Sequence, residues 1–155
     1  MSKSLSRVSA ALQAAGIPGT PVETPTEIRT AEAAAAAAGV LVDQIVKSIL
    51  FQGESGRLYL FLTAGGNRID PERAAALAGE GLLRADVATV RQVTGFAIGG
   101  VAPLGHLTPL PTFLDPRLLD FAEIWAAAGT PRHMFRSAPE ALLRATGATV
   151  AAFTS

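Results

Sequence analysis

Lys47 is the residue whose type and setting most invite a chemical role in this chain of 155 residues. Eleven of the 13 basic residues are arginine, only Lys3 and Lys47 are lysine, and Lys47 lies inside an apolar run. In the simpler interpretation, its stem lies on apolar surface while the ammonium group reaches water. In the functional interpretation, the ammonium group stands at the rim of a pocket as a compact charge for a phosphate or carbonyl oxygen. Spacing alone favours the first interpretation, and both stay open.

A loop rich in glycine and proline is the second candidate. Gly99 and Gly100 are adjacent, and Pro103 follows in the segment 99–111, which holds three glycines and three prolines. Adjacent glycines let a ligand approach the backbone closely and leave N–H donors accessible, and proline stiffens the loop. The spacing matches neither glycine-rich phosphate-binding fingerprint. By itself, therefore, the segment predicts only a shaped loop.

The remaining polar side chains suggest neither a metal site nor a nucleophile. The chain has 0 cysteines, and His106 and His133 stand without a third ligand at metal-binding spacing. Surface or capping roles are expected for both histidines. Ser48 and Ser137 lack a nucleophile-elbow motif, and Ser137 opens a predicted capping box at 137–140.

The composition limits the classes of protein that are possible. With 49% hydrophobic residues the chain is too apolar for an intrinsically disordered protein. Its formal charge of +0 argues against a coat of positive potential that binds long nucleic acid. The longest run without a strongly polar residue, 33–42, is half of the roughly 18 residues that suggest a membrane helix. We expect a soluble, cytoplasmic protein of one domain, with at most a local contact to nucleic acid.

The elements that must position these residues are interspersed helices and strands without regular βαβ order, which predicts a mixed α+β domain. Lys47 falls in a strand over 46–52, which a turn joins to a partner strand over 57–63. The glycine loop is expected to follow a strand over 96–100. The other predicted elements are helices over 4–15, from a Thr30 cap through 38, over 70–78 and over 86–94, a short helix at 115, strands over 124–127 and 133–136, a helix to 147 and a strand to 153.

Four segments, in this order and spacing, carry a resemblance to a known family. They are VDQIVKSILF, FLTAGGNRID, TGFAIGGVAPLGH with LPTFLD, and WAAAGTPRHMF. Together they resemble the YbaK/prolyl-tRNA synthetase-associated editing domain family in its free-standing form, over about residues 28–153. The most specific features are the lysine within an apolar strand and the GxxxP loop, here Gly99 to Pro103 or, one residue shorter, Gly100 to Pro103.

The resemblance implies a fold, an activity and a set of site residues. The fold is a single α+β domain over 1–155, with a curved, mixed and mostly antiparallel sheet. The activity is hydrolysis of wrongly charged aminoacyl-tRNA, most often tRNA(Pro) carrying a smaller amino acid such as alanine. Carried over by position, Lys47 and Gly100 are the implied catalytic residues. The implied substrate-binding residues are Thr30, Ser48, Gly99, Val101, Ala102, Pro103, Gly129 and Thr130.

One departure from the family concerns a pocket wall, because many relatives have paired glycines where this chain has Gly129-Thr130. The implied partners are the acceptor end of an aminoacyl-tRNA and prolyl-tRNA synthetase, with no metal, cofactor or membrane. Two other interpretations stay open: a non-catalytic nucleic-acid-binding module of the same fold, and a small-molecule-binding regulator. The lysine and the GxxxP loop together favour the enzyme.

Overall fold

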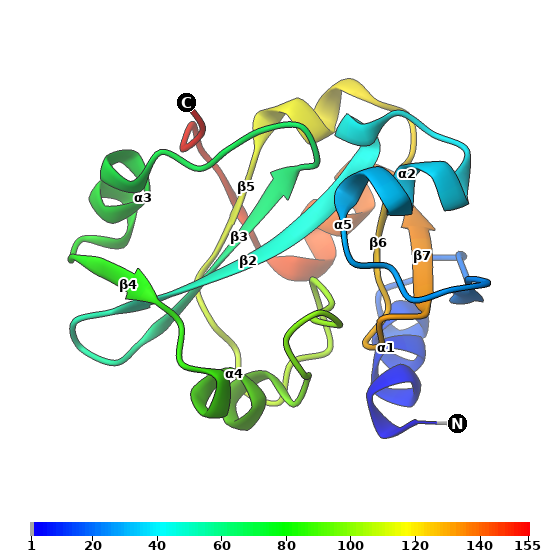
Figure 1. The fold of residues 1–155 in the computed structure, drawn as a ribbon, viewed down its shortest axis with the longest axis horizontal. Coiled ribbons are helices and arrows are strands. Elements are labelled where there is room, and N and C mark those ends of the chain that lie inside the picture. The colour runs from blue at the N-terminus through cyan, green and yellow to red at the C-terminus, as the bar shows by residue number, and fades with distance from the viewer. Residues whose placement is uncertain (1) are drawn as a thin grey trace.

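Two long antiparallel strands, β2 (Ile45–Gly53) and β3 (Leu58–Ala64), form the centre of the structure (Figure 1). The computed structural model describes residues 2–155. The hairpin pairs Lys47 with Thr63, and a turn closed by the Gly53 N–H, which donates to the Arg57 carbonyl at 2.8 Å, joins the strands. Both strands lie where their content of β-branched and aromatic residues predicts them. Lys47 is therefore on a strand, as expected.

The sheet is mixed, and residues 2–155 contribute eight strands to it in the order β1-β7-β6-β2-β3-β5-β8, with β4 paired to β2 outside this path. Four strand pairs are antiparallel, and three, β2–β6, β3–β5 and β5–β8, are parallel. This confirms the single α+β domain with a mixed, mostly antiparallel sheet. The remaining strands are β1 (Val22–Glu23), β4 (Leu82–Arg84), β5 (Thr112–Leu114), β6 (Ile124–Ala127), β7 (His133–Ser137) and β8 (Thr149–Val150).

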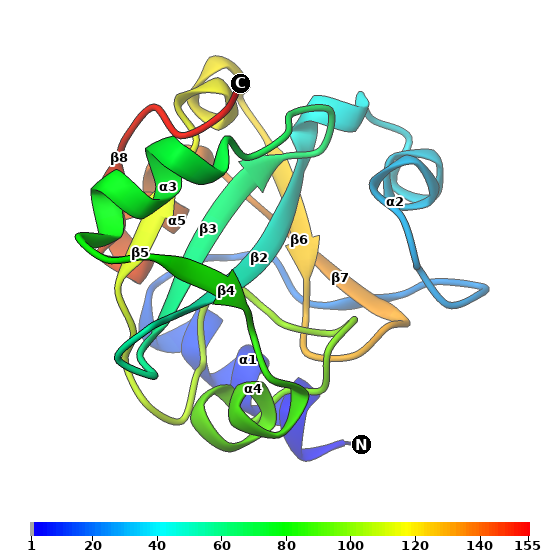
Figure 2. The same ribbon diagram turned by 60° about the vertical axis from the view of Figure 1, so that its left-hand side comes forward.

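The α-helices lie around the sheet, as Figure 2 shows, and residues 2–155 form five of them. Thr30, Asp70 and Asp86 cap the second, third and fourth helices, because each side chain accepts a hydrogen bond from an N–H of the first turn. No helix within residues 2–155 is long and apolar enough to cross a membrane. The helices are α1 (Lys3–Ala14), α2 (Ala31–Ala38), α3 (Pro71–Ala78), α4 (Val87–Thr94) and α5 (Pro139–Thr146), with 3-10 turns η1 (Val42–Gln44) and η2 (Pro116–Asp120).

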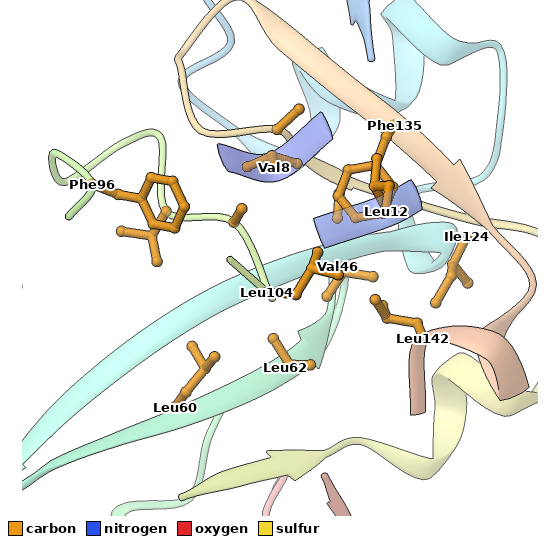
Figure 3. Packing of buried hydrophobic residues seen from close by; sticks show 14 of the residues in the cluster. Val8, Leu12, Val46, Leu60, Leu62, Phe96, Leu104, Ile124, Phe135 and Leu142 are labelled. Atoms are coloured by element: carbon orange, nitrogen blue, oxygen red, sulfur yellow. The ribbon is translucent and has the colours of Figure 1, made fainter. Parts of the chain in front are cut away.

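The main core lies on the face of the sheet that α1 and α5 cover (Figure 3). Val46 of β2 and Leu62 of β3 point to this face, where they meet Leu12 of α1 and Leu142 of α5. Phe96, which follows α4, is fully buried in the same cluster. Burial of each such side chain stabilises the fold by about 1.5–3 kcal/mol, so α1 is an integral part of the domain.

Three local predictions differ from the structure. Residues 96–100 form turns and no strand, because the Gly100 N–H donates to the Ala97 carbonyl at 3.0 Å and Gly99 has a φ of 97°. Ser137 is not a helix cap: its hydroxyl donates to the Ala138 carbonyl at 2.8 Å, and Ala138 holds the cap position without a side-chain bond. The short strands β1, β4 and β5 were not predicted.

Candidate functional site

A gap in strand pairing on one edge of β2 defines the candidate site. On that edge β2 pairs with β6 only at Ile45 and Val46, and with β4 only at 51–53. Within the described chain, residues 47–50 thus have no strand beside them on this edge. A cavity of about 470 Å³ opens there, within the range of about 300–1,000 Å³ that is typical of small-molecule sites.

The cavity has walls from both faces of the sheet. Ile45 and Lys47 project from one face of β2, and Val46, Ser48 and Leu50 from the other, yet all five line it. The cavity therefore runs along the unpaired edge of β2. Its other walls come from the start of α2, from the loop after α4, from β6 and from the turn between β6 and β7.

The Lys47 ammonium group is held in place at this cavity. Its Nζ donates to the backbone carbonyl of Asn67 at 2.6 Å, and the side chain is half-buried. Burial lowers the pKa of Lys47 below its ordinary value of 10.5. Arg68 lowers it further, while Glu32, Asp115 and Asp43 act in the opposite direction. Because one ammonium hydrogen is used by Asn67, two remain for a ligand.

A buried carboxylate fixes the loop that holds Lys47. Asp115 is only 2% exposed, and its Oδ2 accepts from the Ala64 N–H at 3.1 Å and from the Asn67 side-chain amide at 2.9 Å. Its Oδ1 accepts from the Arg117 N–H at 3.0 Å. Asn67 is thus anchored through its side-chain amide, while its backbone carbonyl accepts from Lys47. This network joins segments 20 and 48 residues apart in sequence.

The glycine loop approaches the opposite wall very closely. A Cβ added at Gly100 would lie 3.0 Å from Thr130 Cα and 3.1 Å from its backbone N and C. Only glycine permits this distance between the loop and the β6–β7 turn. Gly99 and Val101 line the cavity, whereas the Gly100 N–H already donates to Ala97. The Gly100 N–H is therefore already used within the loop.

Side chains from α1 and from the loop itself hold this loop in shape. Arg7 Nη2 donates to the Gly95 carbonyl at 2.6 Å, and its guanidinium lies 4.9 Å from the centre of the Phe96 ring. His106 Nε2 lies 2.7 Å from the Ala102 carbonyl and therefore carries the proton of this hydrogen bond. Burial lowers the pKa of His106, which favours the neutral ring. His106 thus stabilises the conformation of the loop, a role that the sequence analysis missed.

His133 is a second histidine with a role that the sequence analysis missed, because it lines the cavity. Thr130 Oγ1 accepts from the Arg132 N–H at 3.1 Å and lies 2.7 Å from His133 Nδ1. Thr130 therefore joins the His133 ring to the backbone of the β6–β7 turn. In the sequence, the only sign of this hydrogen bond is that Thr130 and His133 stand three residues apart. That spacing does not place His133 at a cavity unless the fold is known.

The structure brings together six of the ten predicted site residues at the cavity wall. The six are Thr30, Lys47, Ser48, Gly99, Val101 and Thr130. The other four, Gly100, Ala102, Pro103 and Gly129, are buried directly behind this wall. Gly129 has a φ of 95°, and a Cβ there would lie 2.9 Å from the Ser4 carbonyl oxygen of α1. Gly100 and Gly129 therefore permit close approaches behind the wall, to Thr130 and to α1.

The rim of the cavity carries two arginines that no motif had indicated. Arg29 lies just before α2 and forms an exposed ion pair with Glu27 at 3.1 Å, and Arg84 lies on β4. The two arginine side chains make the mouth of the cavity suited to an anionic ligand. Within residues 2–155, no group of three His, Asp or Glu side chains is placed to hold a metal ion.

Comparisons with known proteins agree with this geometry. A family model of the aminoacyl-tRNA editing domain matches residues 25–145. The uncharacterized protein YwhH of Bacillus subtilis (strain 168) is 31% identical over 120 residues, which cover 77% of this chain and 76% of that protein.

Two solved structures extend the likeness to almost the whole chain. One, described as a candidate trans-editing enzyme for prolyl-tRNA synthetase, is 51% identical with a TM-score of 0.93 and covers 100% of this chain and 99% of its own. The hypothetical protein APE2540 is 27% identical with a TM-score of 0.88, over 96% of this chain and 99% of its own. The chain belongs to the aminoacyl-tRNA editing domain family.

Proposed function

We propose that this protein deacylates mischarged aminoacyl-tRNA in trans, and that its substrate is tRNA(Pro) carrying a small amino acid such as alanine. The observation that carries the proposal is the placement of Lys47, Gly99 and Val101 around one cavity at the unpaired edge of β2. The family and the 51% identical structure support editing chemistry. We further propose that residues 1–155 act as one editing domain.

The reaction requires an attacking water molecule and stabilisation of the negative charge that forms on the ester carbonyl oxygen. Preorganised donors supply this stabilisation, and the removal of one donor in comparable sites costs about 3–4 kcal/mol. We assign Gly99 and Val101 as backbone donors that also position water, with help from the ribose hydroxyl of the substrate. Gly100 shapes the loop against Thr130. No covalent intermediate on the protein is needed.

Lys47 supplies the positive charge. Its two free ammonium hydrogens can bind the terminal phosphate or the ester carbonyl oxygen, while the Asn67 carbonyl holds the third. Arg29 and Arg84 at the rim are placed for the phosphates of the acceptor end. This local grip is compatible with a chain of formal charge +0.

The size of the cavity sets the specificity in this proposal. One methylene group in an apolar pocket is worth only about 1–3 kcal/mol, so a synthetase that accepts proline cannot fully reject a smaller amino acid. A second, smaller site removes that error. We place the protein in the cytoplasm with prolyl-tRNA synthetase as its partner, because mischarged tRNA(Pro) forms there.

A panel of charged tRNAs tests this function. tRNA(Pro) is esterified with alanine, serine, cysteine, 2-aminobutyrate or proline, and the rate of deacylation is measured with excess protein. We expect rapid hydrolysis of the alanyl ester and no acceleration for the prolyl ester. Rapid hydrolysis of prolyl-tRNA would contradict the editing function. Salt-dependent tRNA binding without any turnover would indicate a non-catalytic binding module.

A further inference from the structure

Ser48 is one of the residues of β2 that the gap in the sheet leaves without a strand partner. In an antiparallel pair, residues alternate between those that exchange hydrogen bonds with the partner strand and those that face away from it. Gly53 bonds to Arg57, so the odd-numbered residues of β2 bond to β3, and the even-numbered ones turn their N–H and C=O to the other edge. There, Val46 meets β6 and Gln52 meets β4. Ser48 and Leu50, between them, pair with neither strand, and of these two only Ser48 has a polar side chain.

The side chain of Ser48 is in the same situation as its backbone. Its Oγ is buried and has no hydrogen-bond partner among residues 2–155, and it is the one buried side-chain oxygen or nitrogen there of which this is true. Ser48 lines the cavity. A buried polar group without a partner destabilises a protein. The buried Oγ, together with an N–H and a C=O that no strand pairs on the same residue of the cavity wall, therefore indicates a ligand that satisfies them.

We propose that Ser48 binds the aminoacyl group as a missing rung of the sheet, with its C=O accepting from the α-ammonium group and its N–H donating to the ester carbonyl. A strand residue offers an N–H and a C=O on either side of one Cα, and an aminoacyl ester offers the same pair of groups. Ser48 Oγ is a second acceptor for the ammonium group. The substrate class is therefore an ester of an α-amino acid with a free ammonium group. This inference rests on the proposed function.

The test replaces the ammonium group of the substrate and leaves the protein unchanged. Alanyl-tRNA(Pro) is compared with tRNA(Pro) esterified with lactic acid, which carries a hydroxyl group in place of the ammonium group. Each enzymatic rate is divided by the spontaneous rate for the same ester, because the two esters differ in intrinsic lability. Charge-assisted hydrogen bonds are about twice as strong as neutral ones, so we expect about tenfold less acceleration for the lactyl ester.

Ser48→Ala provides the second arm, with Ser137→Ala as its matched control. Ser137 Oγ is bonded to the Ala138 carbonyl at 2.8 Å and lies outside the cavity lining. We expect Ser48→Ala to keep or raise the urea midpoint, because no hydrogen bond is lost, while KM for the alanyl ester rises and the preference over the lactyl ester shrinks. Ser137→Ala should lower the urea midpoint and leave that preference unchanged.

The results separate this inference from the proposed function. Equal acceleration of the alanyl and lactyl esters would overturn the role of Ser48 and leave the deacylase standing. An unchanged preference in Ser48→Ala would overturn the part assigned to Oγ. Absence of acceleration for every aminoacyl ester would instead overturn the proposed function.

Discussion

The contact between the glycine loop and the β6–β7 turn can be tested by adding one methyl group, in Gly100→Ala. The new Cβ would lie 3.0–3.1 Å from three backbone atoms of Thr130, whereas ordinary contacts begin at 3.4 Å. The loop and the turn must therefore separate by about 0.4 Å. Both segments line the cavity, so the separation changes its shape.

Two opposing effects set the change in the free energy of unfolding of Gly100→Ala. Overpacking of this kind costs typically about 1–3 kcal/mol. Replacement of glycine by alanine recovers about 0.4–1 kcal/mol through the unfolded state, because the φ of Gly100 lies outside the left-handed region. We expect the free energy of unfolding to fall by about 1–2 kcal/mol. A misplacement of 1 Å in an active site can cost about 100-fold, so a shift of this size should lower the deacylation rate about tenfold.

Gly56→Ala is the matched control. Gly56 has a φ of 91° in the β2–β3 turn, and its added Cβ would meet nothing within 4 Å. Backbone strain should destabilise this variant by about 1–2 kcal/mol, without any effect on the deacylation rate. Urea unfolding and single-turnover deacylation of alanyl-tRNA(Pro) are measured for both variants. A wild-type deacylation rate in Gly100→Ala would refute the claim that this close approach shapes the site.

Three further predictions follow from the network around Lys47 and from the loop. Asp115→Asn should lower the free energy of unfolding by about 1–3 kcal/mol and slow deacylation, because the single oxygen of asparagine cannot accept from Ala64, Asn67 and Arg117 together. The control, Asp120→Asn at an exposed ion pair, should change neither quantity. Equal urea midpoints for the two variants would be evidence against the network. Burial lowers the pKa of Lys47, so between that lowered pKa and 10.5 the unfolded state binds more protons than the folded state. The stability of the wild type should therefore rise with pH in this window relative to that of Lys47→Met. A difference in urea midpoint between the two proteins that stays constant across the window would contradict the lowered pKa. Gly129→Ala should destabilise the protein by about 2–5 kcal/mol, because backbone strain adds to a Cβ contact of 2.9 Å with Ser4. The control, Gly147→Ala, has a φ of 64° and nothing within 4 Å of the added Cβ, so it should cost only about 1–2 kcal/mol. Equal shifts in thermal unfolding temperature for the two variants would show that α1 does not pack tightly against the turn.

The parts of the fold that sequence could predict are those with local causes. Thr30, Asp70 and Asp86 cap helices through bonds to N–H groups two or three residues away, so their positions are visible in the sequence. Residues 96–100 were predicted as a strand from their apolar content. The Gly100 to Ala97 hydrogen bond and the packing of Phe96 between α1 and His106 make them a turn instead.

The candidate site shows the same division. Lys47 stands out in the sequence because it interrupts an apolar strand. Its partner Asn67, the carboxylate of Asp115 and the gap beside Ser48 depend on how distant strands pair, and a single sequence does not report this. His133 faces the cavity only because the β6–β7 turn folds back towards α2 and β2. Such roles come from tertiary structure alone.

The central claim is that this cavity deacylates a mischarged tRNA with the Lys47 ammonium group as its positive charge. Single-turnover hydrolysis of alanyl-tRNA(Pro) by the wild type and by Lys47→Met, which keeps the apolar stem and removes the charge, tests it most directly. We predict hydrolysis well above the spontaneous rate for the wild type and a loss of about 100- to 1,000-fold in the variant, with its urea midpoint retained. A variant that hydrolyses the ester as fast as the wild type would contradict the account.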